Sequence, residues 1–443
     1  MELNINEFVD RLLAAAQNAG ISPAEVSVRG SESFKAGARE GKLEEYEVSD
    51  SFSVSLRGKA GARLGTASTQ ALDEESIDML IRGVKESAEL IETDEQDEIM
   101  PPDEHYETVV NYSEALEKVS AQEKIALAMD IDRRMTGADE RLKADQSVVA
   151  SSMTTFSLRN TLGLNLSHRS NVIYAYTSAL ARSGEHSATG FKLLCGYSLE
   201  DVGAKELADG CVSDALAQLG AGRMKSGEYP VVIRNKTMAD LLTTFCGVFS
   251  AENAQKGLSL LAGREGDTIA SAAVTIADDP LMPWGFGSSP FDHEGAATYT
   301  KNVIEGGVLK TLLHNRKTAK KAGVATTGNA AGGGRVAPSN LFIVPGDASL
   351  DDLLGELGDG LYLTEVSGLH AGANAISGDF SLLSRGFMVE GGKITRPVEQ
   401  FTVAGNFYKL LESIERVGSD LLFEGSPIGC PSVRVKALSV AGE

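Results

Sequence analysis

The first 93 residues switch between helical and extended patterns of apolar positions. Apolar residues recur at helical spacing over 5–19 and again from 77 to 91, which predicts two helices. Between them, apolar and polar residues alternate along four short segments: 24–31, 43–48, 52–57 and 62–68. Such alternation is typical of strands in an antiparallel sheet with one buried face. The region therefore predicts a helix, a sheet and a second helix.

The middle of the chain begins with an acidic segment, 94–112, which contains Pro-Pro and lacks periodicity, and we interpret it as a linker. Helical spacing follows over 113–136, although Ser120 and Glu123 match a capping box and favour a later start. Three extended segments and a helical one complete this part: 144–160, 165–179, 187–196 and 200–219. We therefore expect a second α+β unit here.

The remaining residues are rich in glycine and in short extended segments. A break is predicted at 226–230, followed by a strand at 231–234 and a helix from Thr237 to about Phe249. Gly-Gly pairs within 302–309 and 387–394 predict two hairpins, because tight turns need residues with positive φ.

The chain is thus expected to be α+β, with an N-terminal helix-and-antiparallel-sheet region followed by a larger Gly-rich, β-rich C-terminal domain. The expected divisions are an N-terminal subdomain at 1–93, a linker at 94–112, a central subdomain at 113–225 and a C-terminal domain at 226–443.

Composition and charge narrow the classes of partner. The chain carries 41 Lys and Arg against 62 Asp and Glu, a formal net charge of −21, which disfavours direct contact with nucleic acid. No stretch reaches the roughly 20 apolar residues of a membrane span, and the start lacks a basic, apolar leader. The four cysteines form no Cys-x-x-Cys pair. We expect a cytoplasmic protein with buried thiols and with no membrane or nucleic-acid partner.

Local signatures of hydrolytic enzymes are missing from the sequence. A zinc helix needs two histidines one turn apart with an acidic residue, yet none of the six histidines lies within five positions of another. Serine-nucleophile elbows, local cysteine-nucleophile signatures and phosphate-binding loops are also absent. The sequence therefore predicts no catalytic residue, and it leaves open a site assembled from distant parts of the chain.

Two acidic spots and one glycine-rich loop remain as candidates. Asp278-Asp279-Pro280 and Asp292-His293-Glu294 either pair as acid and base or hold a cation, or they cap turns. The Gly332-Gly-Gly334 run that leads into Arg335 is either a flexible loop or a loop that touches a ligand. Both interpretations of each segment stay open.

A further candidate is Ser377-Gly-Asp-Phe-Ser381, where a tight turn meets an apolar strand. Asp379 is placed there to accept backbone N–H groups. His370 and Asn374 lie just upstream, and 402–406 forms another turn before a helical pattern. These segments are either structural turns of a β core or part of a binding surface.

Several of these segments together resemble the TldD/PmbA family, also called the modulator of DNA gyrase family. The matching stretches are 226–231, 257–263, 277–280, 291–295, 338–340, 368–381 and 402–406, with a strand-like segment at 62–68. Each is short, but their number and order extend the resemblance over nearly the whole chain. It is closest to the PmbA (TldE) branch.

The resemblance implies where a zinc site would lie in the catalytic TldD branch. That branch carries a His-Glu-x-x-x-His helix just before the segment at 257–263, and a cysteine near the C-terminus. Counting back places the helix at 242–247, which here reads Leu-Thr-Thr-Phe-Cys-Gly, and the third ligand near Ser419-Asp420. Leucine and glycine offer nothing to zinc, and Cys430 is displaced from the third position. We therefore expect no metal and no cofactor in this chain, with zinc only on a TldD-like partner.

The resemblance further implies a PmbA/TldE-like, non-metal-binding subunit of a peptidase complex. It would pair with a TldD-like paralogue, or form a homodimer when alone, and help enclose a cavity in which unstructured peptides are degraded or matured. An extended peptide along a sheet edge would be held by backbone hydrogen bonds. The residues expected to line this cavity are Asp292, His293, Glu294, Arg335, His370, Asn374, Ser377 and Asp379.

Two alternatives remain. One is a stand-alone metallopeptidase with a rearranged site, whose ligands would come from His293, Glu294, His370, Asp379 and Cys430. The other is a regulator without peptidase activity, as the older family name suggests, although a net charge of −21 disfavours direct DNA contact.

Overall fold

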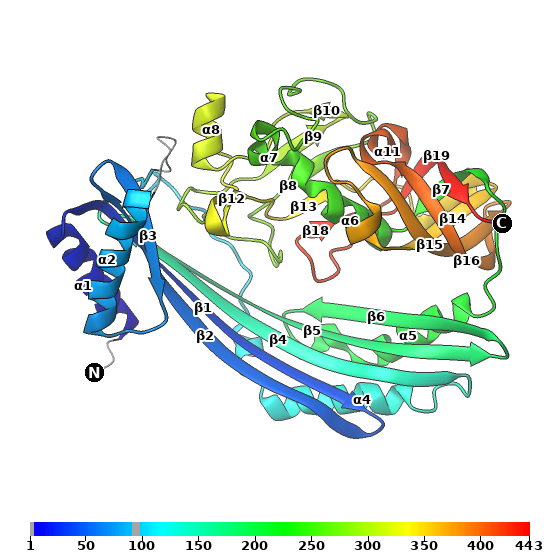
Figure 1. The fold of residues 1–443 in the computed structure, drawn as a ribbon. Helices are drawn as coiled ribbons and strands as arrows, with labels where there is room; N and C mark the ends of the chain where they lie inside the picture. The colour runs from blue at the N-terminus through cyan, green and yellow to red at the C-terminus, as the bar shows by residue number, and fades with distance from the viewer. Residues whose placement is uncertain (1–3, 91–97) are drawn as a thin grey trace.

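The computed structural model describes residues 4–90 and 98–443. A long, curved antiparallel sheet forms one side of the molecule, and the C-terminal part packs above it (Figure 1). Position 91 of the second predicted helix and positions 94–97 of the predicted linker lie outside the described residues. The expected α+β class, with a β-rich C-terminal part, is confirmed.

The long sheet has six strands in the order β3-β2-β1-β4-β5-β6. They are β1 (Ile21–Arg39), β2 (Lys42–Ala60), β3 (Arg63–Thr69), β4 (Leu142–Asn160), β5 (Asn165–Ser183) and β6 (His186–Gly196). Strand β1 pairs with β2 on one side and with β4 on the other, so the two predicted N-terminal units share one sheet. Four of the strands have 19 residues, far above the usual length of about 5–6.

The prediction of separate strands at 43–48 and 52–57 is wrong, because β2 runs through both. The intervening residues are polar and break the alternation, but they still pair with β1, as in Ser31 opposite Ser51. The side chains of this part of β2 are exposed on both faces. Alternation is therefore not required there, since neither face is buried.

Four helices cover one face of the long sheet. The helices α1 (Ile5–Asn18) and α2 (Glu74–Leu90) pack at one end, and α4 (Ala121–Met135) and α5 (Ala204–Gln218) pack at the other (Figure 1). The short α3 (Glu114–Glu117) precedes α4, so the helix predicted over 113–136 is two helices. The capping box of Ser120 and Glu123 begins α4, which confirms the later start.

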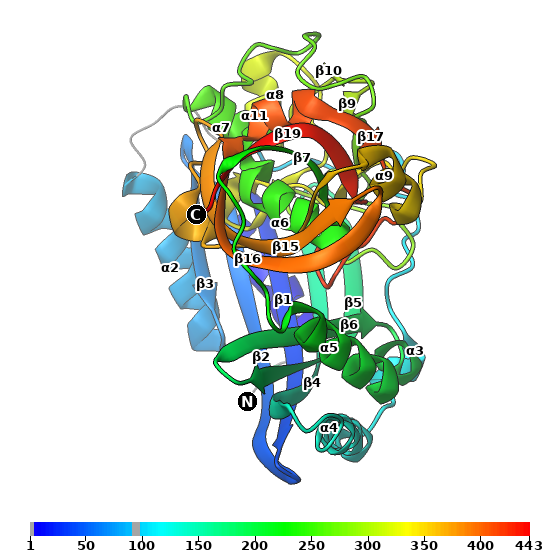
Figure 2. The ribbon, with the colours of Figure 1, turned by 90° about the vertical axis from the view of Figure 1, so that its right-hand side faces the viewer.

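The C-terminal part is built on a sheet in the order β16-β15-β14-β7-β19-β17. Because β16 also pairs with β19, these strands close into a ring, within whose outline α6 (Asn235–Phe245) lies in Figure 2. Apolar side chains of α6 and of the ring strands form one core cluster, so the helix fills the ring. The strands are β7 (Gly227–Ile233), β14 (Gly360–Ser367), β15 (Asp379–Glu390), β16 (Lys393–Asn406), β17 (Ile414–Val417) and β19 (Val433–Ala441).

Strand β7 begins where a break was predicted, so the prediction of a break at 226–230 is wrong. Pro230 lies inside the strand although it has no N–H to donate. The neighbouring strand β19 shifts register at this point, between Val435 and Leu438. Such an irregularity is where a sheet tolerates proline.

Helix α6 also differs from its prediction at both ends. Thr237 does not cap it but lies inside it, where its hydroxyl donates to the carbonyl of Thr364 at 2.7 Å. The α-helix ends at Phe245, and the predicted remainder to Phe249 is a 3-10 turn, η2 (Cys246–Phe249).

A second, smaller sheet has the order β10-β9-β8-β13-β18. Both predicted Gly-Gly hairpins are confirmed, with positive φ at Gly306 and Gly307 between β9 and β10 and at Gly391 and Gly392 between β15 and β16. The small strands are β8 (Ile276–Asp278), β9 (Lys301–Glu305), β10 (Val308–Leu309), β11 (Ala330–Ala331), β12 (Arg335–Val336), β13 (Leu341–Ile343) and β18 (Ile428–Gly429). The remaining helices are α7 (Ala251–Gln255), α8 (Arg316–Ala322), α9 (Leu350–Leu357), α10 (Leu369–Gly372) and α11 (Phe407–Ser413), with 3-10 segments η1 (Leu199–Val202) and η3 (Gly332–Gly334).

The C-terminal part touches the long sheet at its β6 edge. The hydroxyl of Tyr197 donates to the carbonyl of Trp284 at 2.8 Å, and the two rings pack together. Further along, Arg385 donates to the carbonyl of Thr189 at 2.9 Å. These contacts fix the spacing between the two parts, and the cleft described below lies between them.

Two expectations about the chain as a whole concern membranes and thiols. Within residues 4–90 and 98–443, no helix combines the length and apolar character needed to cross a bilayer. All four cysteines are free thiols; Cys211 and Cys430 are buried as expected, whereas Cys195 and Cys246 are half-buried.

Candidate functional site

A cleft of about 490 Å³ lies between the long sheet and the C-terminal loops. Its floor comes from β1, β4 and β5, and its walls come from the segments 286–293, 328–331 and 337–339. The volume is in the usual range for a small-ligand site. Two of the segments singled out from the sequence thus come together here: the one with His293 lines the cleft, and Gly332 of the glycine-rich loop lies beside that histidine.

One row of side chains crosses the floor of this cleft. Arg29 of β1 pairs with Phe156 of β4, which in turn pairs with His168 of β5. Residues directly opposite each other on neighbouring strands point to the same face, so these three side chains lie side by side. The guanidinium of Arg29 packs over the Phe156 ring, 5.3 Å from its centroid.

His293 covers this row from the C-terminal part. Its ring centroid lies 4.9 Å from that of Phe156, and its Nε2 is 3.3 Å from Nη2 of Arg29. Burial, together with the nearby charge of Arg29, lowers the pKa of His293 to about 4. The imidazole is therefore neutral near pH 7, and because Arg29 is always a donor, Nε2 is the acceptor and Nδ1 holds the proton.

The carboxylates of the two acidic neighbours of His293, Asp292 and Glu294, accept hydrogen bonds from backbone N–H groups. Both carboxylate oxygens of the buried Asp292 accept N–H bonds, from Glu294 and Ala296 on one side and from Ala330 on the other, at 2.9–3.0 Å. Burial raises the pKa of Asp292, while these three bonds oppose the change. The carboxylate of Glu294 accepts the backbone N–H of Arg316 at 2.8 Å. This favours the interpretation in which the pair shapes the loop.

The other acidic spot, at 278–280, lies in the core below the cleft. The fully buried Asp278 accepts from the ammonium of Lys301 at 3.0 Å and from the side chain of Asn329 at 2.8 Å. Its second oxygen accepts the N–H of Ser339 at 2.7 Å. Asp278 therefore ties two of the cleft-wall segments, at Asn329 and Ser339, to strand β9 at Lys301, and it does not face a ligand.

The candidate turn at 370–379 is not brought to this cleft. His370 and Asn374 are exposed, and the side chain of Asn374 accepts the backbone N–H groups of Ile376 and Ser377. The carboxylate of Asp379 accepts from Ser377 and Asn406 at 2.8 and 2.9 Å. These bonds, with Asn406 contributing most, lower the pKa of Asp379. The carboxylate of Asp379 thus accepts from side chains, and not from the backbone N–H groups that were expected.

Arg335, the last predicted cavity residue, lies on the glycine-rich loop next to the cleft. Its side chain is exposed, and its Nε donates to the carbonyl of Gly332 at 3.1 Å. The structure thus places Asp292 and His293 at the cleft and Arg335 at its margin. Glu294 is buried behind the cleft, where it bonds the backbone of Arg316, and His370, Asn374, Ser377 and Asp379 lie elsewhere.

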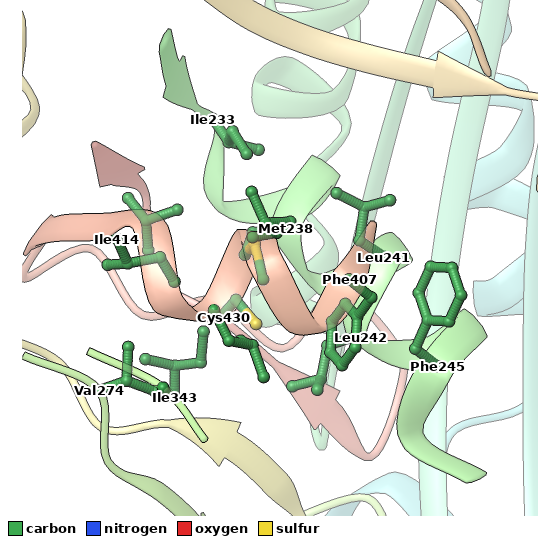
Figure 3. Packing of buried hydrophobic residues seen from close by; sticks show 14 of the residues in the cluster. Ile233, Met238, Leu241, Leu242, Phe245, Val274, Ile343, Phe407, Ile414 and Cys430 are labelled. Atoms are coloured by element: carbon green, nitrogen blue, oxygen red, sulfur yellow. The ribbon is translucent and has the colours of Figure 1, made fainter. Parts of the chain in front are cut away.

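The place where the family resemblance would put zinc is filled with apolar side chains. Leu242 and Phe245 of α6 are fully buried, and the close-up in Figure 3 shows both among the core residues, with Cys430 in the same cluster. Burial raises the pKa of Cys430, which disfavours the thiolate that zinc needs. At the third position, Asp420 accepts from the backbone and hydroxyl of Ser432.

Ligands for a rearranged metal site are not gathered elsewhere in the part of the chain that the structure describes, where no three His, Cys, Asp or Glu side chains form a group that could hold an ion. His293 lies at the cleft, His370 on the distant turn and Cys430 in the core. The residues present therefore do not fit zinc.

Sequence reasoning missed Arg29, Phe156 and His168 as parts of the site. Alternation over 24–31 places Arg29 on the polar face of a predicted strand, which is the one usable signal. The pairing of β1 with β4 joins segments more than a hundred positions apart, and no turn connects them to fix the register.

Comparisons with known proteins agree over the length of the chain. Three models of one family match it: PmbA/TldA metallopeptidase domain 1 at residues 24–88, the central domain at 114–219 and the C-terminal domain at 226–442. The metalloprotease PmbA of Escherichia coli O157:H7 is 26% identical over 429 residues, which cover 95% of this chain and 92% of that protein.

Solved structures give the same result. A candidate modulator of a DNA gyrase from Thermotoga maritima is 34% identical, with a TM-score of 0.93 over 99% of this chain and 100% of that one. TldE from Thermococcus kodakarensis has the same fold, with a TM-score of 0.89 and 21% identity over 98% of this chain and 100% of that one.

Proposed function

The chain belongs to the PmbA/TldD metallopeptidase family, and from that premise we propose that it is the PmbA/TldE-type subunit of a two-part peptidase. In this proposal a TldD-like paralogue holds zinc and cuts the peptide. This chain binds no metal and helps to hold unstructured peptides that are degraded or matured.

One observation carries the proposal: the helix that would hold zinc in the catalytic branch is part of the core here. Met238, Leu241, Leu242 and Phe245 of α6 are all buried within the ring of strands. The side chains that hold zinc in proteins are Cys, His, Asp and Glu, and none of these four residues is one of them. A helix used for packing in a peptidase family supports the role of a subunit that depends on a partner for chemistry.

The half-buried Cys246 does not alter this. Its thiol donates to the carbonyl of Thr243 at 3.2 Å, and burial raises its pKa. A lone thiol of this kind is a poor zinc ligand and a poor nucleophile at neutral pH.

The experiment compares the purified chain alone with the chain co-expressed with a TldD-like paralogue. We expect substoichiometric zinc and no cleavage of an unstructured test peptide by the chain alone, and chelator-sensitive cleavage by the pair. Native mass spectrometry should show a heterodimer in the mixture and a homodimer for the chain alone. As a control, the partner with both histidines of its zinc helix changed to alanine should still form the pair but cut nothing.

Tight stoichiometric zinc in this chain alone, with peptidase activity lost on chelation, would overturn the proposal in favour of a stand-alone metallopeptidase. Loss of that activity in His293→Ala or in His370→Ala would then identify a ligand. Co-purification of gyrase instead of a TldD-like protein would favour the regulator.

A further inference from the structure

The cleft is lined by a cationic side chain, that of Arg29, which has no acidic partner among the described residues. The chain has 62 acidic residues against 41 Lys and Arg, so carboxylates outnumber the basic side chains that could pair with them. Arg29 is exposed at the cleft, where its described contacts are the Phe156 ring and Nε2 of His293. Within residues 4–90 and 98–443, no carboxylate forms an ion pair with it.

The contacts of Arg29 fix its guanidinium in place. The guanidinium carbon lies over the Phe156 ring, and His293 takes one of the N–H donors. Stacking of this kind holds the planar fork in one orientation without neutralising it. The remaining donors are available to a ligand.

The glycine-rich loop passes close to both groups. A Cβ at Gly332 would lie 3.6 Å from Nδ1 of His293 and 3.9 Å from Nη2 of Arg29. Because Nδ1 of His293 is already buried, a larger side chain at this position would chiefly narrow the approach to Arg29. The absence of a side chain here favours the interpretation of 332–334 as a loop beside a ligand.

We propose that this cleft binds the carboxylate of a short peptide, with Arg29 as the carboxylate-binding residue. The planar fork of arginine matches the two oxygens of a carboxylate. Arg29 is the one Lys or Arg among the described residues that line the cleft, which suits a single negative charge better than a phosphate chain. The walls also offer apolar contact through Phe286, Ala331 and Pro338. The inference deepens the proposed function, since it names what part of the peptide this chain holds.

Asp292, an acidic residue that also lines the cleft, does not prevent a carboxylate from binding to Arg29. Asp292 has both carboxylate oxygens engaged by three backbone N–H groups, on the loop that carries His293. These dipoles spread its negative charge into the loop, so the guanidinium remains the group that faces a ligand.

The test measures binding of N-acetyl-alanyl-phenylalanine and of its C-terminal amide to the full chain by isothermal titration calorimetry. We expect the free acid to bind more tightly than the amide. Arg29→Gln should raise the dissociation constant of the acid at least about tenfold, because a charge-assisted fork is lost, and leave the amide unchanged. Arg29→Lys should recover only part of the difference.

The matched control is Arg169→Gln. Arg169 packs over the Tyr112 ring at 3.8 Å, as Arg29 packs over Phe156, but it follows His168 on β5 and so points to the opposite face of the sheet. This variant should bind the acid like the parent chain.

A third ligand, the N-acetyl methylamide of aspartate, separates the two sources of carboxylate. Tighter binding of this ligand than of the free acid assigns the site to acidic side chains. Tighter binding of the free acid assigns it to the peptide C-terminus.

Equal affinity of the parent chain for the free acid, its amide and the aspartate derivative would overturn the proposal, as would an unchanged affinity in a folded Arg29→Gln chain. Failure of the carboxylate-binding proposal can be told apart from failure of the proposed subunit function. Arg29→Gln should leave zinc content and pairing with the TldD-like partner unchanged, so the carboxylate site and the subunit role fail independently.

Discussion

The loop at 292–294 and the turn at 370–379 belong to the same C-terminal part, and each carries an aspartate and a histidine. In the loop, Asp292 is buried and bonded to backbone N–H groups, and the pKa of His293 is lowered to about 4. In the turn, Asp379 is exposed and bonded to side chains, and its pKa is lowered by those bonds. The same residue types thus differ in role because burial differs, and burial is what sequence composition does not state.

The largest effect is expected for Asp278, which is buried like Asp292 of the loop but lies at the end of β8. Asp278→Ala leaves the ammonium of Lys301 in the core without its counter-charge, since the side chains are 0% and 5% exposed. Removing one partner of a buried pair typically costs about 3–5 kcal/mol. Denaturant unfolding followed by circular dichroism should show this loss in the free energy of unfolding.

The control for this change is an exposed ion pair, Lys205–Asp209 on α5, whose side chains are 77% and 65% exposed. Asp209→Ala should alter the unfolding midpoint far less, because water solvates the remaining lysine. A similar loss in the two variants would show that Lys301 is not held in the core by its pairing with Asp278.

The fold was predictable where the signal is local. The hairpins at 302–309 and 387–394 follow from Gly-Gly pairs that supply positive φ, and the start of α4 follows from its capping box. What failed is set by distant contacts. Pro230 reads as a break, yet β7 continues through it, because the two neighbouring strands and the register shift in β19 hold it in the sheet.

The site was predictable only in part for the same reason. His293 and the loop before Arg335 stood out as local sequence features. Arg29 did not, because its role comes from its pairing opposite Phe156 on a strand far away in the chain. Cross-strand neighbours are decided by register, and register over such separations is set by the packing of the whole sheet.

The next effect in size concerns pH and His293. Its pKa is lowered from 6.5 to about 4 on folding, so between these values the unfolded chain binds more protons. The contribution of His293 is therefore complete above pH 6.5 and is lost as pH falls toward 4. We expect a loss on the order of 2 kcal/mol after allowing for partial exposure. His293→Gln should flatten this part of the stability curve.

A difference curve between parent and variant is needed, because burial also lowers the pKa of His168 in the same cleft. His370→Gln, which removes an exposed histidine, serves as the matched control. If the parent and His293→Gln lose stability in parallel between pH 6.5 and 4, the environment of His293 is not the one described.

The smallest loss of stability is expected for Asp379→Asn, because water can solvate the groups that lose a partner in this exposed turn. Each oxygen of Asp379 accepts one bond, from Asn406 and from Ser377. The amide cannot accept both as they stand, but the Ser377 hydroxyl can rotate to accept, and water can solvate whatever is left. Asp292→Asn cannot be relieved in this way, because both carboxylate oxygens accept fixed backbone N–H groups in a buried loop. In the variant, an amide N–H must therefore face another N–H. Asp292→Asn should therefore cost about 1–3 kcal/mol, while Asp379→Asn shifts the unfolding midpoint only slightly at pH 7. Because the pKa of Asp379 is lowered from 3.8, its contribution to stability is present above that value and disappears as pH falls through the lowered pKa. The stability curves of the parent and of Asp379→Asn should merge below the lowered pKa.

Equal losses of stability in Asp379→Asn and Asp292→Asn at pH 7 would contradict the distinction between buried loop and exposed turn.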